Sequence, residues 1–252
     1  MRRRELSRRP LVRHKMNNKF FGDKNDFFKY DLLVELMENS RFLKQLTFIP
    51  MLTRVDSRTG GGLTRYNSGN RRADLYEFLR ECLDTGRRDI RHLKEYFAKK
   101  TFAYAPFRDS TCFTNKTRDE YFHAVPDTAL DNALIFIDPD NGLMDSVGQT
   151  DDKHLTYPEL DRLHNRVKEP SIIVAYHHLA RIRREDLFRS ISKHLQQFHS
   201  KPNAVFVSDN RIAFLVLAKE SGIGLHVEGI LRNYESIHRL KPGVWLPRNT
   251  DC

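Results

Sequence analysis

The amino-acid sequence predicts an α/β protein: a three-layer sandwich with a mostly parallel sheet and a C-terminal β-hairpin. Two short, continuously apolar segments, 133–137 and 172–175, have the character of strands covered on both faces. Segments with helical spacing of apolar residues stand before, between and after them. Two further apolar runs flank Ser208-Asp209-Asn210-Arg211, a hairpin turn signal. Strands that alternate with helices in this way are typical of doubly wound sheets.

The first half of the chain is expected to begin with a helix that Asp26 caps, in which apolar residues recur up to Met37. A short buried strand follows at 46–52. The glycine-, serine- and arginine-rich segment 54–72 is expected to be a mobile loop. Residues 73–98 have two apolar stripes and predict two helical pieces, broken at Thr85-Gly86. Residues 101–128 are expected to be irregular.

The second half begins with the buried strand that ends abruptly at Asp138. The elements expected after it are a helix over 157–167 behind a Thr156 cap, a strand over 171–178, a helix over 184–198, the hairpin within 203–219, an amphipathic helix around 230–237 and a loop-like end.

The composition excludes several classes of protein. Of 252 residues, 39% are hydrophobic and 30% charged, which is enough apolar material for a core. No apolar run approaches the roughly 20 residues that span a bilayer. The N-terminus has no apolar stretch of the kind found in secretory signals. The three cysteines, Cys82, Cys112 and Cys252, are widely spaced and indicate reduced thiols. We therefore expect a cytoplasmic protein without a membrane partner or a structural metal site.

The positive charge is concentrated at the N-terminus. The formal net charge is +10, and residues 1–19 contain eight basic residues against a single acid, Glu5. We expect residues 1–19 to be a disordered basic arm and residues 20–252 to be one α/β domain. Such an arm suits nucleic acid through phosphate neutralisation. Met16 offers a second start, so the sequence leaves open whether residues 1–15 exist in the cell.

Polar clusters follow two predicted strands. Asp138, Asp140 and Asn141 end the strand that starts at Ala133, and Tyr176, His177 and His178 end the strand at 171–178. Arg181 and Arg184 follow the second cluster. In open α/β sheets, ligands bind outside the carboxyl ends of the strands, and we expect the two clusters to share a crevice. Read separately, the first is also good turn chemistry, and a histidine pair can simply end a strand.

The segment FFGDKNDFFKYDLL contains a third polar cluster. The segment places six polar residues among four phenylalanines: Asp23, Lys24, Asn25, Asp26, Lys29 and Tyr30. Aromatic rings with basic neighbours can stack a base and hold its phosphate. A capped helix with its phenylalanines in the core explains the same segment equally well. The sequence contains none of the motifs G-x-x-x-x-G-K-[ST], G-x-S-x-G and H-E-x-x-H.

The order of these parts resembles the J-type ribosomal-RNA adenine methyltransferases. FFGDKNDFFKYDLL is similar to their first helix, and IDPDNG stands where they have an Asp-Pro-Pro-Tyr motif. The resemblance spans residues 17–217 and implies methyl transfer from adenosylmethionine to RNA. In place of the glycine-rich turn that holds this cofactor after the first strand, the chain has FIPMLTRVD.

Two motifs also resemble the uracil-DNA glycosylase superfamily. FIDPDNG is similar to its Asp-Pro pair, and AYHHLARIRR is similar to its later histidine motif. The resemblance implies that Asp138 aligns a water at C1′ of a flipped nucleotide and that His177 or His178 donates to the departing base. Asn141 would then read the base edge.

We therefore expect a DNA glycosylase, a hydrolase that uses no cofactor and has no obligate protein partner. It would remove a flipped base, modified or unmodified, from DNA in preference to RNA. Its biological role would be antiviral defence. The substrate-binding residues expected with it are Asn141, Asp140, Asp23, Lys24, Asn25, Tyr30, Tyr176, Arg181 and Arg184. The alternatives are a methyltransferase, a nuclease that binds Mg²⁺ through Asp138, Asp140 and Asp145, and a protein that binds nucleic acid without catalysis.

Overall fold

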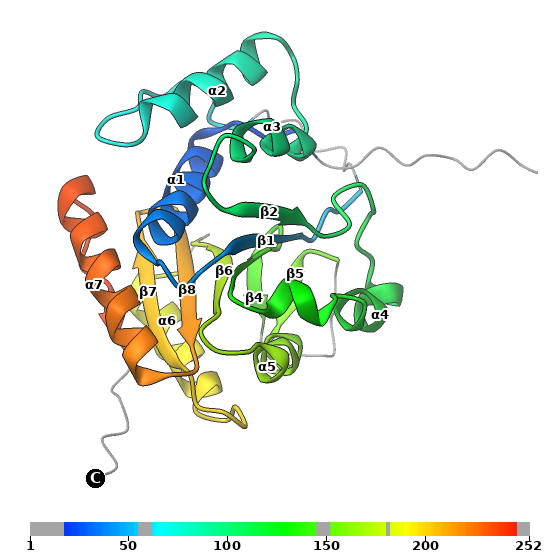
Figure 1. The fold of residues 1–252 in the computed structure, drawn as a ribbon, viewed down its shortest axis with the longest axis vertical. Helices are drawn as coiled ribbons and strands as arrows, with labels where there is room; N and C mark the ends of the chain where they lie inside the picture. Colours follow the sequence, from blue (N-terminus) through cyan, green and yellow to red (C-terminus); the bar gives the residue numbers. More distant parts are fainter. Residues whose placement is uncertain (1–17, 55–61, 145–151, 180–181, 246–252) are drawn as a thin grey trace, which may run out of the picture.

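The computed structural model describes residues 18–54, 62–144, 152–179 and 182–245. Its centre is a seven-stranded sheet of order β2-β1-β3-β6-β8-β7-β9 (Figure 1). The first four strands in this order are parallel to one another, and β8 is antiparallel to β6 and β7. The strands are β1 (Gln45–Pro50), β2 (Ala103–Pro106), β3 (Ala133–Asp138), β6 (Ile172–His178), β7 (Asn203–Ser208), β8 (Ile212–Ala218) and β9 (Val244–Trp245).

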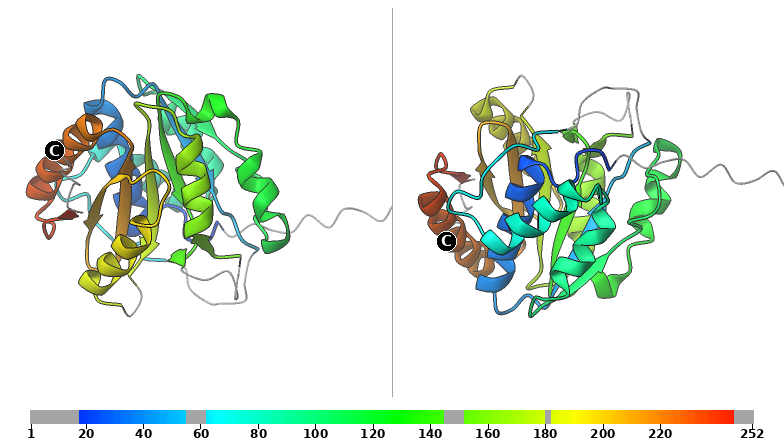
Figure 2. Two further views of the ribbon diagram at one scale, coloured as in Figure 1. Left: turned by 90° about the horizontal axis from the view of Figure 1, so that it is seen from below. Right: turned by 90° about the horizontal axis from the view of Figure 1, so that it is seen from above.

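Helices cover both faces of the sheet, which makes the three-layer sandwich that the sequence predicts (Figures 1 and 2). On one face lie α1 (Lys24–Asn39), α2 (Ala73–Asp84), α3 (Leu93–Phe97) and α7 (Ser221–His238). On the other face lie α4 (Arg118–His123), α5 (Tyr157–Arg166) and α6 (Arg184–Leu195). Each central strand divides its residues between the two layers: Phe136 packs against the first set of helices, and Ile135 and Ile137 pack against the second. Both faces are therefore apolar, as the continuous hydrophobic runs indicate.

Most of the predicted elements are confirmed. The strand at 133–138 has the predicted bounds, the helix after Thr156 begins at Tyr157 with a capping box, and the C-terminal hairpin turns between Ser208 and Ile212. The helical stretch from residue 73 ends at Asp84, and a short 3₁₀ turn and α3 follow after the predicted break.

The first helix differs from the prediction at its start. Its N-cap is Asp23 rather than Asp26, because Asp23 Oδ1 accepts hydrogen bonds from the backbone N–H groups of Asn25 (2.8 Å) and Asp26 (3.0 Å). The Asp26 carboxylate instead accepts the backbone N–H of Gly22. Gly22 has φ +82°, which favours glycine at the turn before the helix.

Four short strands lie outside the strands that the sequence predicted. β2 adds a parallel edge strand within 101–128, and β9 adds a short strand in the C-terminal segment. A separate two-stranded parallel pair, β4 (Gly142–Met144) and β5 (His154–Thr156), stands beside the main sheet. All are two to four residues long, and such short runs carry almost no periodic signal.

The basic arm falls almost entirely outside the described residues, since the description begins at Asn18. No helix in the described part of the chain has the length and apolarity that crossing a membrane requires.

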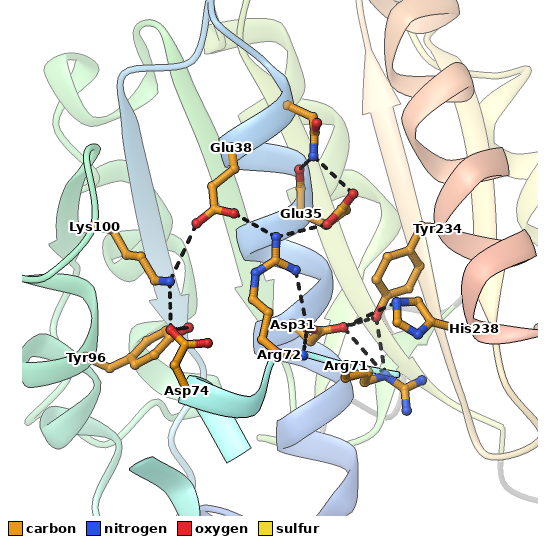
Figure 3. A network of polar contacts seen from close by, with 11 residues as sticks. Asp31, Glu35, Glu38, Arg71, Arg72, Asp74, Tyr96, Lys100, Tyr234 and His238 are labelled. Carbon is orange, nitrogen blue, oxygen red and sulfur yellow. Dashed lines mark hydrogen bonds and ion pairs between the residues drawn. The ribbon is translucent and has the colours of Figure 1, made fainter. Parts of the chain in front are cut away.

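A buried polar network fastens α1 to its neighbours (Figure 3). Asp31, on α1, is fully buried and accepts hydrogen bonds from the Tyr234 hydroxyl of α7 (2.7 Å) and from the backbone N–H of Arg72 (3.1 Å). The Arg72 guanidinium also reaches Glu35 and Glu38 on α1. Because a buried carboxylate must be paired, this network fixes α1 against α2 and α7.

Asp31→Ala is expected to lower the free energy of unfolding by about 3–5 kcal/mol, because it leaves the buried Tyr234 hydroxyl and the Arg72 backbone N–H without their acceptor and removes the charge that faces Arg71 and Arg72. Urea unfolding measures the change. Glu38→Gln is the matched control: it removes a half-exposed carboxylate of the same network and should cost at most about 1 kcal/mol. Equal losses for both variants would contradict the central role of Asp31.

Candidate functional site

A pocket of about 660 Å³ opens at the carboxyl ends of β1, β3 and β6. β2, the next strand after β1 in the chain, lies on one side of β1 in the sheet. β3 and β6 lie on the other side of β1, so the order of strands reverses between β1 and β3. Pro50 and Asp138, the paired last residues of these two strands, both line the pocket. Ligands bind at such switch points in open α/β sheets.

The N-terminus of α1 forms the opposite wall. Asp23, Asn25, Asp26, Lys29 and Tyr30 all line the pocket. Asp23 and Asp26 stand three residues apart, as do Asp26 and Lys29, so helical periodicity places them along one side of α1. The predicted clusters at residues 23–30, 138–141 and 176–178 therefore meet in one cavity.

A buried ion cluster joins the two walls. The Lys29 ammonium donates to both oxygens of Asp138, each at 2.9 Å, and lies 3.0 Å from Asp26 Oδ1. It also lies 4.5 Å from the centre of the Tyr176 ring, a cation–π contact. The ammonium is thereby held by two carboxylates and one aromatic face at the end of β3.

Burial sets the protonation behaviour of these groups. Burial raises the pKa of Asp138 to about 6. The Asp26 carboxylate also raises this pKa, whereas the Lys29 ammonium lowers it. Burial alone would lower the pKa of Lys29, but the Asp138 and Asp26 carboxylates outweigh it and raise the pKa above its ordinary value. Lys29 is therefore a permanent cation, while Asp138 titrates near neutrality.

Asp23 titrates in the same range. Burial and the nearby Asp26 carboxylate raise its pKa to about 6, although the backbone N–H groups that it caps and the Lys29 ammonium act in the opposite direction. The pocket thus contains two carboxyl groups with raised pKa values, a property that is common in functional sites.

The loop after β3 forms a third wall. The Thr53 hydroxyl donates to Asp140 Oδ2 at 2.9 Å, and Lys153 lies 3.7 Å from the same oxygen. The backbone of Asn141 bonds Lys153 on one side and His178 on the other. These bonds hold the Asp-Pro-Asp-Asn segment as a turn and also present Asp140 and Asn141 to the pocket, so the turn and site interpretations both apply.

The two adjacent histidines face different surroundings. His178 lines the pocket together with Asp138. His177 is buried outside the lining and accepts the backbone N–H of Leu143 through Nδ1 at 2.9 Å. Burial lowers the pKa of His177 to about 4, so the ring is neutral. Gly142, with φ +114°, packs so closely on this ring that a Cβ would lie 2.4 Å from Nδ1.

Two other predicted residues lie away from the pocket lining. Lys24 is exposed on the outer side of the first helical turn. The Arg184 guanidinium donates to the carbonyls of Lys241 and Pro242 and stacks on Phe188, so it ties α6 to the C-terminal segment. Arg181 lies outside the described residues.

The polar cluster predicted at residues 23–30 included Lys29 and Asp26, but neither residue was among the expected substrate-binding residues. The spacing Asp23, Asp26, Lys29 was the available signal, because it places three ionisable groups near one another at a helix start. For the metal hypothesis, the described residues contain no group of three or more His, Cys, Asp or Glu side chains that could hold an ion. Asp145, the third proposed ligand, lies outside them.

Comparison with known proteins gives little further information. No family model matches the chain, and no curated protein does. Among solved structures, protein LPL1258 from Legionella pneumophila, a member of the family DUF519, is similar over 90% of this chain and 96% of its own, with 10% identity and a TM-score of 0.39.

Lys29→Met is expected to lower the free energy of unfolding by about 3–5 kcal/mol, because it leaves the Asp138 and Asp26 carboxylates buried without their cation. The double variant Lys29→Met/Asp138→Asn should recover at least about 1 kcal/mol of that loss, since one of the unpaired charges is gone. Chemical denaturation of the four proteins in this cycle measures the coupling. Strictly additive losses would show that the pair is not energetically linked.

Proposed function

We propose that the protein is a nucleic-acid-modifying hydrolase that binds one unstacked nucleotide in this pocket and cleaves its N-glycosidic bond, with DNA as the substrate. The observation that carries the proposal is the Asp138 carboxylate, fixed by Lys29 on the wall of an open pocket at the switch point of the sheet. The pocket volume lies within the range of roughly 300–1,000 Å³ that is usual for small-ligand sites.

The chemistry follows from the fixed carboxylate. As the bond between C1′ and the base nitrogen breaks, positive charge develops on the sugar, and an ionised Asp138 would stabilise it and orient the attacking water. Water supplies hydroxide to C1′, and the proton that it loses passes to the Asp138 carboxylate. The departing base takes up a proton, and His178, on the same pocket, is the group placed to donate it.

Lys29 would act by positioning, not as a nucleophile. An amine must lose its proton before it attacks a sugar carbon, and the two carboxylates keep Lys29 charged. The reaction would therefore pass through no covalent lysine adduct, and its product would be an intact strand with an abasic site.

Basic and aromatic residues suit a nucleic-acid substrate. Lys19, Lys153 and Arg211 line the pocket together with Phe20, whose ring is 41% exposed. Lysine and arginine neutralise phosphates, and an exposed ring offers a stacking surface for a base. The biological role that we propose is antiviral defence, in which the enzyme would remove modified bases from viral DNA.

Methyl transfer is the second candidate, because one observation favours it. β8 lies between β6 and β7 and is antiparallel to both. Rossmann-type methyltransferases have an antiparallel strand in this position, whereas all-parallel doubly wound sheets do not. The residues after β1 do not form the glycine-rich turn with which that family holds adenosylmethionine. The Leu52 carbonyl accepts the Phe113 N–H at 2.7 Å, and the next helix along the chain starts only at Ala73. A binding protein without catalysis is the third.

Incubation with DNA that contains ordinary and modified bases, followed by mass spectrometry, should detect a free base and alkali-labile sites without earlier strand breaks. Asp138→Asn is expected to lower the rate per folded molecule by about 10²–10³-fold, because the amide retains the shape of the side chain but lacks its charge. Circular dichroism at the assay temperature measures the folded fraction. Borohydride should trap no adduct. In parallel incubations of DNA and of RNA with adenosylmethionine, a methylated product would instead establish the second candidate, and unchanged DNA bound equally well by Asp138→Asn would establish the third.

The rate of base release is expected to fall as the pH decreases through about 6, because protonation of Asp138 removes the charge that stabilises the transition state. In Asp23→Asn this acid limb should stay in place, although Asp23 titrates in the same range. A pH profile of kcat/KM for both proteins tests the assignment. An acid limb that disappears in Asp23→Asn would transfer the role to Asp23.

A further inference from the structure

Two buried polar atoms on the pocket-lining residues have no hydrogen-bond partner within the described part of the chain. They are Asn18 Oδ1 and the hydroxyl of Tyr30, a residue that is 1% exposed. Buried polar atoms in folded proteins are almost always hydrogen-bonded, because an unpaired one costs the free energy of its lost hydration. Two such atoms on one pocket therefore indicate that a ligand completes them.

A third acceptor on the pocket lining belongs to Asp23, a residue that is 3% exposed. Asp23 Oδ1 is occupied by the two backbone N–H groups that it caps, and no N–H or O–H group of a described residue bonds Asp23 Oδ2. The neighbouring carboxylates are already engaged: Asp26 by Lys29 and Gly22, and Asp138 by Lys29. The three atoms left to a ligand are thus two acceptors and one hydroxyl.

We infer that the pocket selects a base that carries an exocyclic amino group, namely adenine, cytosine or guanine, over its deaminated counterpart; this rests on the proposed function. An amino group supplies hydrogens to the acceptors Asn18 Oδ1 and Asp23 Oδ2, and the Tyr30 hydroxyl donates to an acceptor on the ring. Uracil and hypoxanthine have a carbonyl oxygen in place of the amino group. That oxygen would face a carboxylate without a hydrogen between them.

Aromatic surface at the mouth is consistent with a flipped base. The exposed Phe20 ring lies on the pocket, and the Lys19 ammonium stands 5.0 Å from its centre. A base that leaves the duplex loses its stacking, and an aromatic side chain can replace part of that contact for any base. Stacking therefore favours entry, while the three polar atoms decide which base is retained.

Competition binding with duplexes that carry one base opposite an abasic site tests the inference. The pairs to compare are cytosine against uracil and adenine against hypoxanthine, each differing at the amino position. The amino-bearing duplex should bind at least about tenfold more tightly, which corresponds to one good base contact. Equal binding, preference for the deaminated base, or no binding to any duplex would overturn the inference. Selective binding without base release would refute the proposed reaction alone.

Tyr30→Phe should reduce the selectivity ratio to within about threefold while the melting temperature stays equal or rises, because the hydroxyl removed has no partner in the described protein. Tyr76→Phe is the matched control. Its hydroxyl donates to the Tyr66 carbonyl outside the pocket lining, so that variant should keep the full ratio. Full selectivity in Tyr30→Phe would contradict the role assigned to Tyr30.

Discussion

The ion pair between Lys29 and Asp138 is the interaction on which the rest of the site depends. It connects a helix near the N-terminus to the end of a central strand, and neither charge could be buried there without the other. With the ammonium also held by Asp26 and Tyr176, the start of α1 is drawn across the ends of β1 and β3. The pocket exists because the helix closes over the switch point of the sheet in this way.

The same pairing divides the work among the polar residues. Lys29 stays charged beside its carboxylates, so it positions Asp138 and supplies no nucleophile. Asp138 gains a fixed orientation from Lys29, while burial raises its pKa to about 6 against the effect of that ammonium. The two adjacent histidines separate into a packing residue, His177, and a pocket residue, His178, because successive side chains of a strand point to opposite faces.

The sequence predicted the central strands and the hairpin well, because long apolar runs and turn residues are local signals. It also predicted that the residues closing β3 and β6 would lie together, since parallel strands end at one edge of the sheet. It could not predict the partner of Lys29, which is 109 residues away along the chain. Nor could it show that Arg184 bonds the chain around Pro242, because that contact depends on the tertiary arrangement.

Helix α1 is fastened from two sides. Lys29 joins it to the sheet, and Asp31, two residues later and so about half a turn away, joins it to α7 and to the chain before α2. Rolling the helix about its axis would break one attachment or the other. The wall of the pocket is therefore preorganised before a ligand binds. Recognition depends on how well the ligand fits a site that is already formed.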